Sequence, residues 1–145
     1  MKVKLHLILL FIAIIAGVSP APVAAYDTPE DLYRYLATVR RVIDGNTISA
    51  DVDLGFGVWM HKAEIRLKGV KITSMEEDSA KGVAAHKFLH ETLKDQERIL
   101  IQTYYDPTGK YDGWYGKVSI WDEDKEDWIS VNQIVIDAGH GTAEE

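Results

Sequence analysis

The sequence contains 145 residues, carries a formal net charge of −7 and has no cysteine. A chain of this length suits one domain, and the lack of cysteine excludes disulfides, zinc–thiolate sites and cysteine nucleophiles. The excess of acidic residues also disfavours nucleic acid as a partner, because cationic side chains must neutralise its phosphates.

Residues 1–25 have the pattern of a secretory signal peptide. Lys2 and Lys4 precede an apolar run at residues 5–18, and the small residues at 23–25 are typical of a signal-peptidase site. The apolar run is shorter than the roughly 20 residues that span a bilayer. We therefore expect a cleaved signal and a secreted or periplasmic protein, with no stable membrane insertion after cleavage. An uncleaved membrane anchor is the alternative. Cleavage would leave 14 basic and 23 acidic residues, a net charge of −9.

Residues 26–36 are a polar lead-in, and the sequence predicts a single domain over residues 37–145. Strands are expected where β-branched residues are frequent or where apolar and polar residues alternate. The alternation is clearest in the second expected strand, whose apolar face consists of Ile48, Ala50, Val52 and Leu54. The expected strands cover residues 36–43, 47–54, 58–67, 98–105 and 114–121.

Two helices are predicted, one after the third strand and one after the fifth. Residues 79–94 and 131–138 both place apolar residues at helical spacing, and Ser130 and Gly139 suit the start and end of the second helix. Residues 122–127 are expected to form a charged, solvated turn. This order of elements indicates an α+β fold that is mainly β: a five-stranded OB-type barrel with two or three flanking helices.

The segment Val42-Ile43-Asp44-Gly45-Asn46-Thr47 places Asp-Gly, a strong hairpin signal, between the first two expected strands. It resembles the metal-binding hairpin of the staphylococcal-nuclease-like (thermonuclease) family, which reads V-I-D-G-D-T. The similarity extends over residues 37–140 and rests on six short segments in the same order: 38–47, 53–59, 65–70, 108–111, 131–133 and 138–140.

The resemblance implies a Ca²⁺-dependent phosphodiesterase that acts on DNA and RNA. In that chemistry carboxylates hold Ca²⁺, a glutamate is the general base and two arginines clamp the phosphate. Arg66 matches the first arginine, and Asp44 lies near the family's metal as an outer participant. At four other matched positions the family residue is replaced: Asn46 and Lys71 stand at the metal carboxylates, Ser74 at the general base and Gly113 at the second arginine.

These substitutions predict that the chain has lost phosphodiesterase activity and acts as a binding or accessory module without a cofactor. A protein or another non-phosphate ligand is the expected partner. The first alternative is a Ca²⁺-dependent endonuclease with a rearranged site, in which Glu76 or Glu77 supplies the base. The second alternative is a purely structural accessory protein.

Two of the candidate residues also have ordinary structural interpretations. Arg66 could form an ion pair with Glu64 or Asp51 instead of binding phosphate, and we expect such a pair. Lys71 could balance Asp44 in place of a lost ion.

Aromatic and histidine side chains give two further candidate sites. Tyr111, Trp114 and Tyr115 could stack on bases or sugars, as aromatic side chains do in OB folds, or they could be core and strand-pairing residues. His86 and His90 are four positions apart and could face one metal, but solvated histidines on a helix surface are the expected interpretation.

Overall fold

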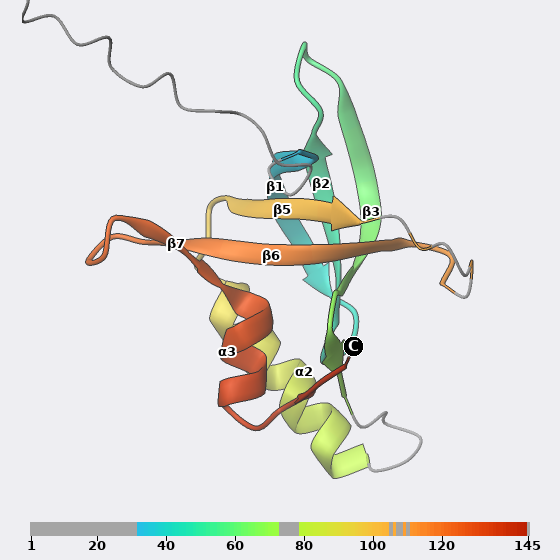
Figure 1. The fold of residues 1–145 in the computed structure, drawn as a ribbon, viewed down its shortest axis with the longest axis vertical. Helices are drawn as coiled ribbons and strands as arrows, with labels where there is room; N and C mark the ends of the chain where they lie inside the picture. Colours follow the sequence, from blue (N-terminus) through green and yellow to red (C-terminus); the bar gives the residue numbers. More distant parts are fainter. Residues whose placement is uncertain (1–31, 73–78, 105, 107–108, 110, 145) are drawn as a thin grey trace, which may run out of the picture. The chain divides into compact units, whose positions relative to one another are not determined.

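A sheet of six strands forms most of the protein in the computed structural model, which describes residues 32–72, 79–104, 106, 109 and 111–144 (Figure 1). Its strands are ordered β3-β2-β1-β5-β6-β7. Residues Leu32–Glu145 form one compact unit with its own hydrophobic core, so we expect this unit to fold on its own. The strands are β1 (Arg34–Val42), β2 (Thr47–Asp53), β3 (Trp59–Leu67), β5 (Ile99–Tyr104), β6 (Trp114–Asp122) and β7 (Asp127–Ser130).

Parallel pairing between β3 and β6 closes this sheet into a barrel. Ile65, Arg66 and Leu67 pair with the first residues of β6, whereas the other neighbouring strands in the sheet pair antiparallel. The closed barrel consists of β1, β2, β3, β5 and β6, and β7 extends the β6 hairpin beyond it. The predicted α+β fold, a five-stranded OB-type barrel with flanking helices, is therefore confirmed.

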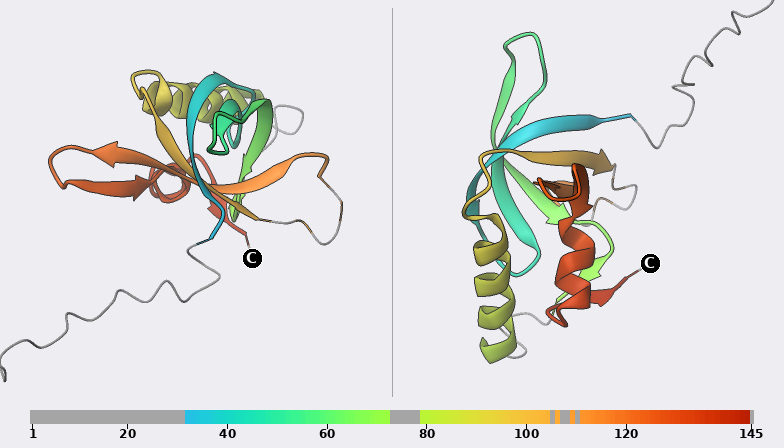
Figure 2. Two further views of the ribbon diagram at one scale, coloured as in Figure 1. Left: turned by 90° about the horizontal axis from the view of Figure 1, so that it is seen from above. Right: turned by 90° about the vertical axis from the view of Figure 1, so that its left-hand side faces the viewer.

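Two helices, α2 (Ser79–Leu93) and α3 (Val131–Asp137), lie at the end of the barrel opposite the β2–β3 hairpin (Figures 1 and 2). Beside them β4 (Val70–Lys71) pairs with β8 (Thr142–Ala143). The Ser130 side chain caps α3 by accepting a hydrogen bond from the Gln133 N–H, and Gly139 follows the helix with a left-handed φ of 75°. Both sequence signals for this helix are confirmed.

The core fills the barrel and continues under the helices. Three of the four residues predicted on the inner face of β2 are buried, but Leu54 is exposed because β2 ends at Asp53 and the chain there has left the barrel. The buried hydrophobic residues are Ala37, Ile48, Ala50, Val52, Ala63, Ile65, Leu67, Val70, Ala85, Leu89, Leu93, Ile99, Ile101, Val118, Ile120, Val131 and Val135.

Several boundaries differ from the expectations. β1 begins at Arg34, inside the segment interpreted as a lead-in, and β7 follows the charged turn where no strand was expected. β4 and β8 are two-residue strands, too short to produce a sequence period. Residues 1–31, which include the expected signal peptide, lie outside the described residues. Within the described residues no helix is long and apolar enough to cross a membrane.

Candidate functional site

The turn between β1 and β2 is the core of the candidate site. The Thr47 carbonyl oxygen accepts hydrogen bonds from the Ile43 and Asp44 N–H groups at 2.8 and 3.3 Å, which confirms the predicted hairpin. Glycine was expected at position 45 because a hairpin turn often needs a positive φ, but Gly45 does not have one. Glycine is needed there for a different reason, since a Cβ at this position would lie 2.5 Å from the Ala85 Cβ on α2.

Asn46 is a buried structural residue of this turn. Its side chain is among the least exposed in the protein, with 1% of the residue surface accessible. The Asn46 Nδ2 group donates to the Val70 carbonyl at 2.7 Å, and its Oδ1 accepts from the Thr47 hydroxyl at 3.3 Å. An aspartate could not donate to Val70, so this amide ties the turn to β4 in a way that a metal carboxylate could not.

Asp44 and Arg66 both lie close to this turn. The Asp44 carboxylate accepts the Asn46 N–H at 2.9 Å, and Arg66 on β3 pairs in register with Thr47. The Arg66 guanidinium lies 5.5 Å from the centre of the Tyr111 ring, within cation–π range. Among the described residues Arg66 forms no ion pair with the two carboxylates proposed as its partners, so that interpretation is wrong.

Tyr111 fills the space beside Arg66. A Cβ added to Gly113 would overlap the Tyr111 ring, so a larger residue at this position requires the ring to move. Burial first, and then the negative charge of Glu64, raise the pKa of Tyr111. The phenol is therefore neutral at physiological pH, and its hydroxyl has no hydrogen-bond partner among the residues that the structure describes.

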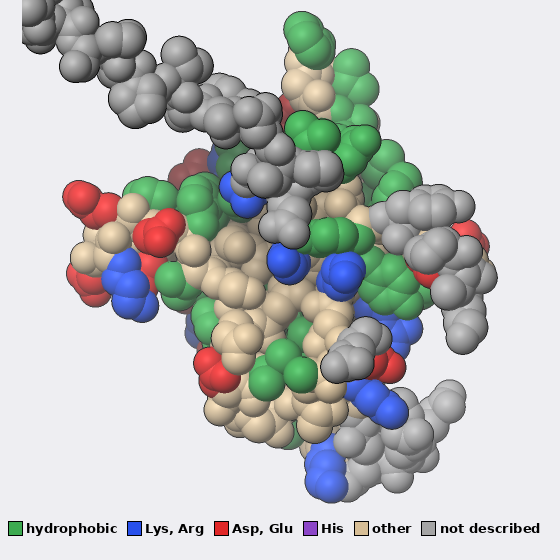
Figure 3. Space-filling view, viewed as in Figure 1, with side chains coloured by type: hydrophobic (Ala, Val, Ile, Leu, Met, Phe, Trp, Pro, Cys, Tyr) green, Lys and Arg blue, Asp and Glu red, His purple; other side chains and the backbone are tan. Residues whose placement is uncertain are grey.

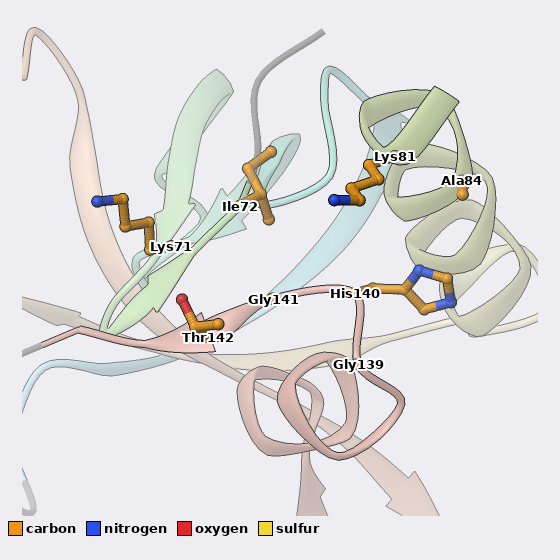
Figure 4. A pocket seen from close by; sticks show the side chains of 8 residues that line it. All are labelled: Lys71, Ile72, Lys81, Ala84, Gly139, His140, Gly141 and Thr142. Carbon is orange, nitrogen blue, oxygen red and sulfur yellow. The ribbon is translucent and has the colours of Figure 1, made fainter. Parts of the chain in front are cut away.

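Lys71 stands at the edge of the candidate site and is exposed. It belongs to β4, where it pairs with Thr142, and Figure 4 shows its side chain directed away from Lys81 and His140. No ion pair joins Lys71 to Asp44 within the described part of the chain. Ser74, like Glu76 and Glu77, lies outside the described residues. The hollow in Figure 4 has a volume of about 440 Å³ and is lined by Lys71, Ile72, Lys81, Ala84, Gly139, His140, Gly141 and Thr142.

The donors described at this site fit Ca²⁺ poorly. Ca²⁺ takes six to eight oxygen ligands, usually with several carboxylates among them. Here Asp44 already accepts a backbone hydrogen bond, Asn46 presents an amide bound to neighbouring residues, and Lys71 brings a positive charge. No three histidine or acidic side chains gather as a metal-binding group in the described residues. His86 and His90 are among the described residues, so no third histidine or acidic side chain joins them there to bind a metal.

The aromatic candidates are divided between packing and exposure. Tyr111 and Tyr115 pack together, with ring centres 5.4 Å apart, so Tyr111 contacts both Tyr115 and Arg66. Trp114 remains exposed. A second aromatic group, which sequence analysis did not identify, lies on the outer face of the barrel: the Lys68 and Lys117 ammonium groups lie 4.7 and 5.6 Å from the Tyr104 ring centre.

Asp51 organises a polar cluster that sequence analysis also missed. Although it lies on the outward-facing side of β2, it is only 4% exposed. Its carboxylate accepts from Arg40 Nε at 2.7 Å and from the Lys62 N–H at 2.9 Å, and it lies 3.0 Å from His61 Nδ1. Arg40 first, then the Lys62 N–H and His61, hold the pKa of Asp51 well below its usual range.

Replacing Asp51 with Asn is expected to lower the urea midpoint of unfolding at pH 7. Because the pKa of Asp51 is depressed in the folded state, the charged carboxylate stabilises the fold above its unfolded pKa, about 3.9. This stabilisation is lost as the pH falls toward the folded pKa. The difference between wild type and Asp51→Asn should therefore shrink below about pH 4.

Glu123→Gln, at an exposed position of the β6–β7 turn, is the matched control and should leave the midpoint nearly unchanged. An Asp51→Asn variant that follows the wild type from pH 3 to pH 7 would mean that the cluster does not stabilise the fold through the charge of Asp51.

Asn132 links α3 to the barrel and is 7% exposed. Its Oδ1 accepts from the Val118 N–H at 2.9 Å, while its Nδ2 donates to the carbonyls of Lys68 and Gly116 at 2.9 and 3.1 Å. The sequence placed Asn132 on the closing helix, but its role in linking α3 to the barrel was not predicted. The one signal in the sequence was an asparagine next to residues expected to be buried and apolar.

No protein-family model matches this chain. No curated protein matches it either. The resemblance to thermonucleases therefore remains a prediction from short motifs in the right order.

Proposed function

We propose that this chain is a non-catalytic, OB-type binding module, exported from the cytoplasm, whose nuclease-like site is closed by its own side chains. The observation that carries the proposal is the buried Asn46 amide. Its hydrogen bond to Val70 requires a donor where metal-dependent hydrolysis would require a carboxylate. The proposal concerns the family mechanism, in which metal, base and two arginines act together.

The surroundings of Arg66 support the same conclusion. The ring of Tyr111 lies beside both Arg66 and Gly113, so a phosphate that approached Arg66 would meet a neutral aromatic ring in place of a second guanidinium. Losing one donor that stabilises a transition state typically costs ~10²–10³ in rate. Losing general-base help typically costs another ~10²–10⁴.

The net negative charge points away from nucleic acid as the partner. Binding is then expected through the outer surface of the barrel. A protein or another surface that is not recognised through phosphate fits this charge, and no cofactor is needed for such a role.

A nuclease assay tests the proposal directly. Residues Leu32–Glu145 are incubated with single-stranded DNA and millimolar Ca²⁺, alongside Arg66→Ala and Arg41→Ala. Arg41 is an exposed arginine on β1, close to the β1–β2 turn, and serves as the matched control. We expect no cleavage above background for any of the three proteins.

Cleavage by the wild type that disappears in Arg66→Ala and persists in Arg41→Ala would overturn the proposal and favour the rearranged nuclease. Cleavage that is equal in all three proteins would instead indicate a contaminating nuclease, and repurification should remove it.

A further inference from the structure

The hairpin between β2 and β3 projects beyond the barrel and ends in four exposed hydrophobic side chains (Figures 1 and 3). We call these residues the apolar tip: Leu54, Phe56, Val58 and Trp59. Residues 54–60 contain no charged side chain, although 27% of the whole chain is charged. Isolated exposed hydrophobic residues are common, but a contiguous group marks a contact surface.

The apolar tip is a preformed turn. The Leu54 N–H donates to the Val58 carbonyl and the Val58 N–H donates to the Gly55 carbonyl, both at 2.9 Å. The Asp53 carboxylate accepts the Gly55 N–H at 2.9 Å. Gly55, Phe56 and Gly57 all have left-handed φ values, of 82°, 54° and 76°. Phenylalanine rarely adopts this conformation, yet here it leaves the Phe56 side chain fully exposed.

Three further exposed hydrophobic residues, Leu32, Tyr33 and Leu36, lie at or before the start of β1. The pairing of β1 with β2 ends at Ala37, and from Arg34 to Ala37 β1 pairs with β5. Leu36 borders a hollow beside Trp121 and Trp128. These three residues are therefore not part of the apolar tip, which holds four of the ten large hydrophobic residues that are exposed in the described part of the chain.

Strand addition at this end is disfavoured. β6 pairs only with the last three residues of β3, so residues Trp59 to Glu64 have no partner strand on that side among the described residues. Lys62 has a left-handed φ of 56°, and the β2–β3 register shifts between Ala50 and Val52. A bulge and charged side chains such as Lys62 and Glu64 both protect the edge of a strand from pairing with another chain.

We propose that the apolar tip docks on the surface of a lipid bilayer, with Phe56 among the acyl chains and Trp59 at the level of the headgroups. The tip is convex and presents side chains outward, which suits a soft apolar phase. Tryptophan is enriched at membrane interfaces because its ring is apolar and its N–H is polar.

The remainder of the chain favours a membrane over a second protein. The apolar run at residues 5–18 is the kind of segment that enters a bilayer during export. In the uncleaved chain, while that run is embedded, residues 19–31 can hold Leu32 no more than about 45 Å from the membrane. A chain with a negative net charge is not attracted to anionic lipid, so docking must depend on apolar burial and should be no stronger on anionic than on neutral vesicles.

Docking on a bilayer would give the proposed binding function a partner, but it is argued from the β2–β3 hairpin and not from the residues around Arg66. The nuclease assay tests the site near Arg66, and a vesicle assay tests the tip. Each can therefore fail without the other.

Vesicle sedimentation tests the inference on residues Leu32–Glu145, the compact unit with its own core. Wild type, Phe56→Asn and Val83→Asn are mixed with phosphatidylcholine vesicles, with and without 30% phosphatidylglycerol, at low and high salt. Asparagine tolerates a left-handed φ, so Phe56→Asn should keep the turn. Val83 is an exposed hydrophobic residue on α2, at the other end of the barrel. Val83→Asn therefore also replaces an exposed hydrophobic side chain with asparagine, but away from the apolar tip.

We expect the wild type and Val83→Asn to bind neutral vesicles similarly at low and high salt, and to bind anionic vesicles no more strongly. Phe56→Asn should bind about 10- to 100-fold more weakly, which corresponds to about 1.4–2.7 kcal/mol. The same ranking is expected in the full chain, where the apolar run adds an equal contribution to every variant. Thermal melting should give the same midpoint for Phe56→Asn and the wild type.

Three results would overturn the inference. One is the absence of wild-type sedimentation with vesicles, and another is equal binding by wild type and Phe56→Asn. The third is a concentration-dependent oligomer that Phe56→Asn disrupts while vesicles bind neither protein, because that result would make the tip an interface between two copies of this chain.

Discussion

Replacing Asn46 with Asp, the residue that the thermonuclease motif would have, is expected to lower the free energy of unfolding by about 2–4 kcal/mol at pH 7. The substitution removes the donor that holds the Val70 carbonyl at 2.7 Å. It also places a carboxylate oxygen against that carbonyl oxygen in a position that is 1% exposed. A change that restores the motif should therefore destabilise this protein.

The loss should depend on pH. Burial next to a carbonyl raises the pKa of the new carboxyl group above its unfolded value of about 3.9. Below about pH 4 the group is mostly protonated in both states and can donate to Val70, so the penalty should be small. As the pH rises the unfolded state ionises first, and the penalty grows until the folded group also ionises.

Urea unfolding of wild type and Asn46→Asp at pH 4 and pH 7, with and without 5 mM Ca²⁺, measures this effect. Asp44→Asn is the matched control, because it changes the charge of a half-buried residue in the same turn. An Asn46→Asp protein as stable as wild type at pH 7 would contradict our account of Asn46. Stabilisation by Ca²⁺ that appears only in Asn46→Asp would show that a single carboxylate restores a metal site.

Replacing Asn132 with Ala is expected to reduce the free energy of unfolding by about 3–4 kcal/mol. The Val118 N–H and the Lys68 carbonyl would lose the partner that each has in this side chain. Gly116 would be less affected, since its carbonyl also accepts the Lys68 N–H at 2.9 Å. The loss should loosen α3 from the strand that closes the barrel.

Gln133→Ala, one position along the same helix, provides the comparison. Gln133 is exposed and its side chain binds only Asp137 in the described contacts, so its replacement should change stability by no more than about 0.5 kcal/mol. Similar urea midpoints for Asn132→Ala and Gln133→Ala would mean that water replaces the buried amide without cost.

The barrel was predictable because its strands and helices carry strong local patterns. Ile48, Ala50 and Val52 of β2 are buried and Ser130 caps α3, as expected. The polar residues between them, Ser49 and Asp51, are buried as well, so the exposure along β2 does not alternate. β4 and β8 were not predictable, since two-residue strands have no period and exist only because distant segments meet. Leu54 was misplaced because alternation alone does not show where a strand leaves the barrel.

Site residues were harder to interpret than the fold. The sequence identified position 46 as altered, but it could not show that the Asn46 amide binds a carbonyl 24 residues further along the chain. The contact between Tyr111 and Gly113 depends on the side-chain rotamer, which no local pattern encodes. Asp51 was considered as a partner for Arg66, yet Arg40 binds it instead, because the bulge in β1 after Val39 brings Arg40 to that face.

Closure of the barrel has a consequence for how quickly it can form. Ile65 must find Trp114, and Ala37 must find Ile99, before the cylinder is complete. Each of these pairings closes a loop of roughly 50 to 60 residues. The conformational entropy of that loop is lost before the new contacts can stabilise the fold. Barrels dominated by such distant contacts fold over about milliseconds to seconds, whereas helical bundles take microseconds to milliseconds. The β1–β2–β3 meander, joined by short turns, is the part of this chain that can assemble without that delay.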